Sequence, residues 1–190
     1  TVAQFLNASS AKEIIWTRGT TEAINLVAQT WGRQNIKQGD AICLTEMEHH
    51  ANIVPWQMLA QSVGAHLNII PVDDQGELRL DELSKVLSPQ TKILALTHVS
   101  NVLGTINPIK KIITAAKQQI PSLTVLVDGA QAVAHLPVDV RDLGADFYTF
   151  SGHKLSGPTG IGILYGRKAL LDAMPPWHGG GNMILSVTWD

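Results

Sequence analysis

Short runs of β-branched and aromatic residues alternate with amphipathic stretches along the whole chain, and this order leaves few architectures open. Several runs are apolar throughout, which is typical of strands covered by helices on both faces. The alternation predicts βαβ units and an α/β fold: a mostly parallel sheet of about seven strands between two helical layers. The predicted strands are 14–17, 41–44, 66–70, 92–97, 123–127, 146–150 and 162–165.

Helical periodicity separates these runs. The stretch from Thr21 to Trp31 places apolar residues on one helical face, and the Thr21 hydroxyl is predicted to cap it. Pro108 is predicted as the first residue of another helix, and Gly64 as the stop of a third. After the first helix, the predicted helices are 52–63, which Gly64 ends, 80–87, 109–119, which Pro108 begins, and 167–174.

Composition excludes several classes of protein. Of 190 residues, 45% are hydrophobic and 16% charged, so the chain is not disordered. A net charge of -2 offers no basic surface for a phosphate backbone, and we expect no nucleic-acid partner. No run of about 18 apolar residues occurs, so we expect no membrane span. Cys43 is the single cysteine, which excludes disulfides and cysteine-rich metal sites within the chain and fits the cytoplasm.

One domain is expected over residues 1–174, because no repeat or linker interrupts them. Composition shifts after Met174, where two prolines precede the glycines at 179–181, and this predicts an exit segment over 175–190. The chain starts without Met and ends abruptly. We therefore expect it to be a piece of a longer protein.

Polar residues follow five of the predicted strands. Because parallel strands end at the same edge of a sheet, where open α/β folds bind ligands, these residues are expected to meet there. The five groups are 19–21, 48–50, 100–101, 128–131 and 151–154.

Three of these groups suggest specific chemistry, and each has a plainer explanation. Gly19, Thr20 and Thr21 begin a helix, and the free amides at a helix start bind anions. The plainer explanation is an ordinary turn glycine next to a threonine that caps the helix. Asp128 ends a buried strand and needs a cation or several donors there, unless it caps the next helix. Lys154 lies between an aromatic strand and a glycine-rich turn, where a neutral amine could attack an aldehyde, whereas most lysines are simply hydrated.

Two other motifs are set aside. The glycine run 157–162 matches neither dinucleotide nor P-loop spacing and precedes a strand. Glu46, Glu48, His49 and His50 are neighbours whose side chains diverge, so no metal site is expected. Taken together, the anion site, the strand-end acid, the recessed lysine and an imidazole are the equipment for pyridoxal phosphate (PLP).

Five motifs, in order along essentially the whole chain, resemble the cysteine desulfurase and selenocysteine lyase family. More narrowly, they resemble the group II desulfurases within the class V aminotransferases, which have the type I PLP fold. The chain resembles their large, cofactor-binding domain. The motifs are TRGTTEAINLV at 17–27, EHHANIVPW at 48–56, HVSNVLG at 98–104, DGAQA at 128–132 and SGHKLSGPTG at 151–160.

The resemblance implies a role for each matching residue. Lys154 would form the Schiff base with the cofactor and then move protons on the substrate, and His49 would stack on the pyridine ring. Asp128 would pair with the ring N–H. Gln131 would bond the phenolic oxygen, and Asn101 would lie beside it, near the substrate carboxylate. The implied phosphate contacts are Thr20, Thr21, Ser151 and His153.

The resemblance also implies a reaction: sulfur passes from L-cysteine to an enzyme cysteine as a persulfide, L-alanine is released, and the sulfur serves iron–sulfur cluster assembly. The family's acceptor cysteine lies beyond Asp190, on a C-terminal loop. Cys43 belongs to a predicted strand and is expected to be inert packing. We likewise expect three further parts of the family outside this chain: its N-terminal segment, the small C-terminal domain with its carboxylate-binding arginines, and a partner residue that completes the phosphate site past 179–184.

The implied partners are L-cysteine or L-selenocysteine, a sulfur-acceptor or scaffold protein, and a second copy in a homodimer. Other functions remain open at this stage. The same motifs serve selenocysteine lyases, aminotransferases and kynureninase-like enzymes, and a non-catalytic remnant could keep the fold. The 48–56 motif and the Ser-Gly-His-Lys form around Lys154 favour a desulfurase.

Overall fold

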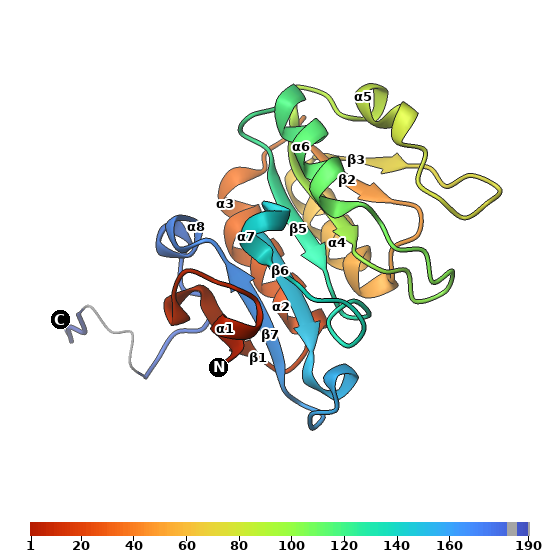
Figure 1. The fold of residues 1–190 in the computed structure, drawn as a ribbon. Helices are drawn as coiled ribbons and strands as arrows, with labels where there is room; N and C mark the ends of the chain where they lie inside the picture. The colour runs from red at the N-terminus through yellow and green to blue at the C-terminus, as the bar shows by residue number, and fades with distance from the viewer. Residues whose placement is uncertain (182–185, 190) are drawn as a thin grey trace.

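A seven-stranded sheet forms the centre of the computed structural model, which describes residues 1–181 and 186–189 (Figure 1). The strand order is β1-β7-β6-β5-β4-β2-β3. Only β7 runs against its neighbours, β1 and β6, and the other pairs are parallel. The strands are β1 Ile14–Thr17, β2 Ala41–Thr45, β3 His66–Ile70, β4 Thr91–Thr97, β5 Thr124–Asp128, β6 Phe147–Ser151 and β7 Gly162–Gly166.

The sequence-based prediction of a mostly parallel α/β sheet is confirmed. All seven predicted strands form, and each boundary lies within one residue of its expected place. The small shifts matter at two positions, because Asp128 and Ser151 are the last residues of β5 and β6 instead of the first residues after them. Both side chains are therefore held by strand backbone.

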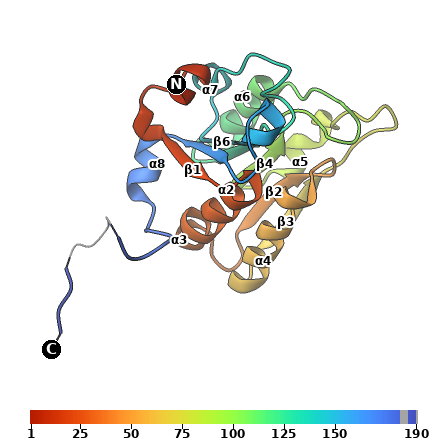
Figure 2. The same cartoon turned by 90° about the horizontal axis from the view of Figure 1, so that it is seen from below.

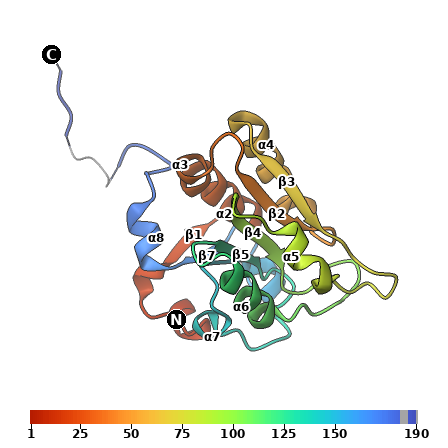
Figure 3. The ribbon, with the colours of Figure 1, turned by 90° about the horizontal axis from the view of Figure 1, so that it is seen from above.

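Helices cover both faces of this sheet (Figures 2 and 3). On one face, α2 (Thr20–Val27) and α4 (Val54–Val63) pack Ile24, Trp56 and Leu59 against the sheet. On the other, α5 (Leu83–Val86) and α6 (Ile109–Gln119) bury a second cluster that includes Ile112 and Ile113. The shorter helices are α1 Val2–Phe5, α3 Arg33–Asn35, α7 Val140–Leu143 and α8 Lys168–Ala173.

Of three predictions about helix ends, two are wrong and one is confirmed. Thr21 does not cap α2: the N-cap is Gly19, with no side-chain hydrogen bond, and Thr21 lies inside the first turn. Pro108 is the N-cap of α6 instead of its first residue. Gly64 does stop α4, with φ 74° in the left-handed region that glycine favours.

Other helices are shorter or more irregular than their periodicity indicates. The predicted helix 52–63 begins as a 3-10 turn, η3 (His50–Asn52), and only then continues as α4. The stretch after α2 widens into a π-helix over Ala28–Gly32. In the described part of the chain, no helix is long and apolar enough to cross a membrane. Within the predicted exit segment 175–190, residues 182–185 and 190 lie outside the described residues.

Candidate functional site

All nine residues singled out from the sequence line one cavity of about 280 Å³ at the carboxyl ends of the parallel strands. The lining comes from the segments that follow β1, β2, β4, β5 and β6, as the topology predicts. The nine residues are Thr20, Thr21, His49, Asn101, Asp128, Gln131, Ser151, His153 and Lys154. Four further lining residues were not predicted: Ala51, Thr97, Val99 and Ala130.

One end of the cavity is the start of α2. The buried Ser151 hydroxyl accepts a hydrogen bond from the Thr20 amide at 2.9 Å and lies 2.9 Å from the Thr20 hydroxyl. The backbone of β7 packs directly against Gly19, since a Cβ on Gly162 would lie 2.4 Å from the Gly19 Cα. The Thr20 amide is therefore engaged by Ser151, while Thr21 lines the cavity beside the positive end of the helix.

Asp128 supplies a buried acid to the same cavity. It is 5% exposed, and its Oδ1 accepts the Ala130 amide at 2.9 Å. Burial raises the pKa of this carboxyl, while the Ala130 amide and the Lys154 charge oppose the rise. The predicted alternative, a helix cap, is wrong, because a hydrogen-bonded turn and not a helix follows Asp128. The placement in the cavity keeps the other role, pairing with a cation, available.

Gly129 explains why the chain turns so tightly after Asp128. A Cβ on Gly129 would lie 2.1 Å from Cε1 of Tyr148, a ring that is fully buried on β6. The Tyr148 hydroxyl lies 3.0 Å from Nδ1 of His98, which holds the ring in place. Any side chain at position 129 would push against this ring and displace the neighbouring carboxyl.

Lys154 lies in a 3-10 turn, η5 (Gly152–Leu155), directly after β6. Its side chain is half-buried and lines the cavity that Asp128 also lines. The turn is compact, because the Gly152 amide donates to the Ile161 carbonyl at 2.8 Å and the Gly157 amide to the Gly152 carbonyl at 2.9 Å. The amine therefore enters the cavity from a rigid support.

His49 contributes an imidazole in a defined tautomer. Its Nδ1 accepts the Ala51 amide at 3.1 Å, so the proton of the neutral ring is on Nε2. Burial lowers the pKa of this imidazole, with smaller contributions from the charges of His50 and Lys154. The ring can donate one proton, from Nε2.

Asn101, Gln131 and His153 complete the set. Asn101 and His153 are exposed at the rim, and Gln131 is half-buried. Asn101 belongs to the loop between β4 and α6, where the Ser100 hydroxyl accepts the Leu103 amide at 3.1 Å. These three side chains are free to contact whatever occupies the cavity.

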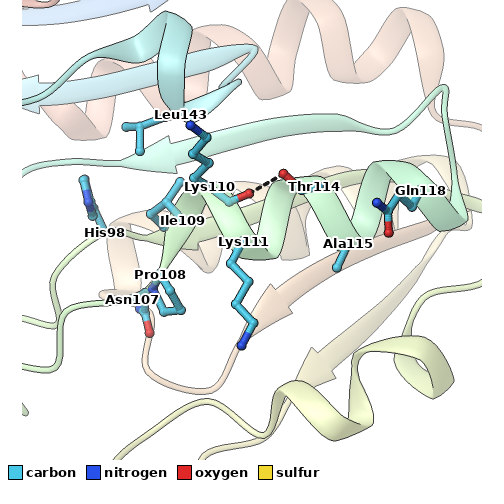
Figure 4. A pocket seen from close by; sticks show the side chains of 10 residues that line it. All are labelled: His98, Asn107, Pro108, Ile109, Lys110, Lys111, Thr114, Ala115, Gln118 and Leu143. Carbon is cyan, nitrogen blue, oxygen red and sulfur yellow. Dashed lines mark hydrogen bonds between the residues drawn. The ribbon is translucent and has the colours of Figure 1, made fainter.

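A larger cavity of about 680 Å³ lies along α6, with Leu143 of α7 on one side and His98 beside the start of the helix (Figure 4). None of the nine predicted residues lines it. Lys110 and Lys111 project from its helical wall. Volume alone therefore does not select the functional site.

The sheet order, with β7 antiparallel to both β1 and β6, defines a three-layer α/β protein. Its polar cavity lies at the carboxyl edge of the sheet, where open α/β folds bind ligands. The class-V aminotransferase family model matches residues 1–190, and the chain belongs to this family.

Its relatives include cysteine desulfurases. The chain is 61% identical over 187 residues to the cysteine desulfurase of Yersinia pseudotuberculosis serotype IB (strain PB1/+), covering 98% of this chain and 46% of the relative. The crystal structure of the cysteine desulfurase CsdA from Escherichia coli superposes with a TM-score of 0.94 at 49% identity, covering 99% of this chain and 47% of that one. The chain thus spans about half the length of the relatives it matches.

Two more distant structures indicate what related sites hold. A C-DES variant with glycine covalently linked to its PLP cofactor has a TM-score of 0.81 at 29% identity, covering 94% of this chain and 47% of that one. SspA in complex with cysteine has a TM-score of 0.85 at 30% identity, covering 95% of this chain and 51% of that one.

Proposed function

We propose that this chain is the cofactor-binding part of a PLP-dependent cysteine desulfurase. The observation that carries the proposal is the single cavity that joins Lys154, Asp128 and His49 to the N-terminus of α2. This donor set fits PLP, because it offers an amine for the aldehyde, an acid for the ring nitrogen and an anion site for the phosphate. When bound, PLP supplies an electron sink that acidifies the substrate Cα.

The chain's own residues would then orient the ring and move protons. Asp128 would hold the proton on the ring nitrogen: burial raises the pKa of this carboxyl, and a cationic ring beside it would favour the ionised form that accepts the N–H. Lys154 would be the covalent anchor and then the base at the substrate Cα. His49 would cover the ring face and donate its Nε2 proton.

The phosphate would lie at the start of α2. Thr21 offers an amide and a hydroxyl there, and His153 lies at the cavity rim. Ser151 would act mainly by holding Thr20, since its hydroxyl already accepts the Thr20 amide. Gln131 and Asn101 would contact the phenolic oxygen and the substrate carboxylate.

The sulfur acceptor is proposed to lie outside residues 1–190. Cys43 is fully buried on β2, and burial, together with the Glu48 charge, raises the pKa of its thiol to about 12. A buried thiol of this kind does not form the thiolate that attacks sulfur. The same proposal includes L-cysteine as substrate, a sulfur-accepting or scaffold protein as partner, and a homodimer. It also includes a cytoplasmic location, a role in iron–sulfur assembly, and the division into a domain at 1–174 and an exit segment at 175–190.

The test combines covalent labelling with product analysis. Protein mixed with PLP and reduced with borohydride should carry the cofactor on Lys154, and Lys154→Ala should abolish the adduct. The full-length protein should release alanine and reducible sulfur from L-cysteine in equal amounts. An adduct that persists in Lys154→Ala refutes the site, whereas pyruvate or a transaminated product refutes desulfuration but keeps a class V enzyme.

A further inference from the structure

A buried glutamate, Glu48, lies behind the candidate site, and the proposed chemistry does not use it. It is 8% exposed and directly precedes His49. Its Oε1 accepts the Thr45 hydroxyl at 2.5 Å and the Thr97 amide at 2.8 Å. Since Thr45 ends β2 and Thr97 ends β4, one side chain joins the ends of two strands.

The second carboxyl oxygen closes a turn around His49. Oε2 of Glu48 accepts the Asn52 side-chain amide at 2.7 Å. Within the same turn, the Asn52 backbone amide donates to the His49 carbonyl at 2.7 Å, and the Ala51 amide donates to the His49 ring at 3.1 Å. Glu48 thus fastens the turn that orients the His49 ring to the strand ends beneath it.

The polarity of this network is set by Trp56. Its indole can only donate, and it donates to Oδ1 of Asn52 at 3.0 Å. The Asn52 amide nitrogen must therefore face Glu48, which in turn must accept. The side chains of Glu48, Asn52 and Trp56 are all buried, so a donor facing a donor would leave a polar group unpaired where water does not reach.

We propose that Glu48 is a positioning residue of the site: by joining the ends of β2 and β4 to the turn at 50–52, it holds the His49 ring over the cavity. Glu48 does not line the cavity, so it acts through His49. The inference rests on the proposed function, which assigns the ring-covering role to His49.

The alternative is that Glu48 stabilises the fold and nothing more. Glu13 is a matched control for this alternative: it is 7% exposed and also accepts several amides, those of Ser9, Ser10 and Lys168. It precedes β1 at the amino end of that strand, away from the cavity. Glu13→Gln therefore perturbs a buried carboxyl of similar surroundings without touching the site.

Three variants test the proposal: Glu48→Gln, Glu13→Gln, and the double variant Glu48→Gln with Asn52→Asp. In Glu48→Gln, the new amide nitrogen faces a donor in either orientation, the Thr97 amide or the Asn52 side chain. In the double variant, the carboxylate introduced at position 52 accepts from both the new amide and Trp56, which restores every bond.

Two measurements separate positioning from stability. The first is the ¹⁵N spectrum of the His49 ring without cofactor, and the second is the dissociation constant of PLP from its visible absorption band. We expect both glutamine variants to lower Tm. Only Glu48→Gln should move the His49 ring signals and weaken PLP binding, by on the order of tenfold as for other outer partners of a site. The double variant should recover the His49 ring signals and the PLP affinity of wild type.

The proposal is overturned if Glu48→Gln and Glu13→Gln have the same His49 ring signals and the same PLP affinity. It is also overturned if the double variant regains the wild-type Tm without regaining PLP affinity. Should Glu48→Gln not fold, Thr45→Val removes one donor and should shift the His49 signals in the same direction by less. No shift in that variant counts against the proposal. Wild-type protein that binds no PLP refutes the proposed function, while the His49 spectrum still decides the role of Glu48.

Discussion

The Thr20 and Ser151 hydroxyl oxygens lie 2.9 Å apart although the residues are separated by 131 positions in the sequence. This contact joins the start of α2, the proposed anion site, to the end of β6, which the lysine turn follows. In the proposed function, the distance between a bound phosphate and Lys154 would depend in part on this hydroxyl pair.

Replacing Ser151 by alanine should loosen this junction. The buried Thr20 amide and hydroxyl would lose their partner, at a cost of about 1–3 kcal/mol in the free energy of unfolding. PLP affinity should fall as well, because the helix start is no longer held against β6. Urea unfolding and cofactor titration measure the two effects. Ser122→Ala, at an exposed serine, is the control, and equal behaviour of the two variants would contradict the expectation.

Gly129→Ala should damage the site through packing. The new methyl group would overlap the Tyr148 ring, and overpacking of this kind destabilises by about 1–3 kcal/mol. The shift also moves the Asp128 carboxyl, so the PLP absorption band should change in position or intensity. Gly179→Ala, where a Cβ meets open space, is the control. A Gly129→Ala protein with unchanged Tm would show that the ring moves freely.

Cys43 should resist alkylation in the native protein. Its thiol is fully buried, and the pKa of about 12 keeps it protonated at pH 8. Peptide mass mapping after iodoacetamide treatment should find Cys43 unmodified until denaturant is added. Labelling of native protein as fast as of unfolded protein would reopen Cys43 as a sulfur acceptor.

The carboxyl of Glu48 should make stability depend on pH. Burial raises the pKa of this group from its ordinary value of 4.5 to about 8. Between pH 4.5 and about pH 8, the folded state therefore binds more protons than the unfolded state. The stability contributed by the protonated carboxyl is lost as the pH rises through this range. The free energy of unfolding of wild type should fall relative to that of Glu48→Gln from pH 5 to pH 8 in urea titrations. A constant difference would refute the raised pKa.

Local patterns were enough for the strands and for nine of the thirteen residues that line the cavity. A buried parallel strand needs a continuous apolar run, so 92–97 and 123–127 were recognisable without their neighbours. Parallel strands end at one edge, so the residues that follow them were expected together, and the nine predicted residues do line one cavity. Their chemical roles stay predictions until cofactor binding is measured.

Errors arose where a distant residue competes with a local signal. The sequence around Thr21 predicts a helix cap, yet the N-cap is Gly19, two residues earlier, and the Thr20 amide donates to Ser151 at the end of β6. The sequence places Glu48 among the residues after a strand but does not predict its partners, because Thr97 lies 49 positions away.

The sequence by itself thus determined the architecture, the family resemblance and nine of the residues that line the cavity. Each of these depends on periodicity, composition or motifs, which are properties of neighbours in the chain. Tertiary structure alone decided that Asp128 and Ser151 end their strands, that Gly129 must lack a side chain beside Tyr148, and that Glu48 links two strands behind His49. These features depend on close packing and on pairing buried polar groups across the sheet, and no local pattern records which distant atoms will meet.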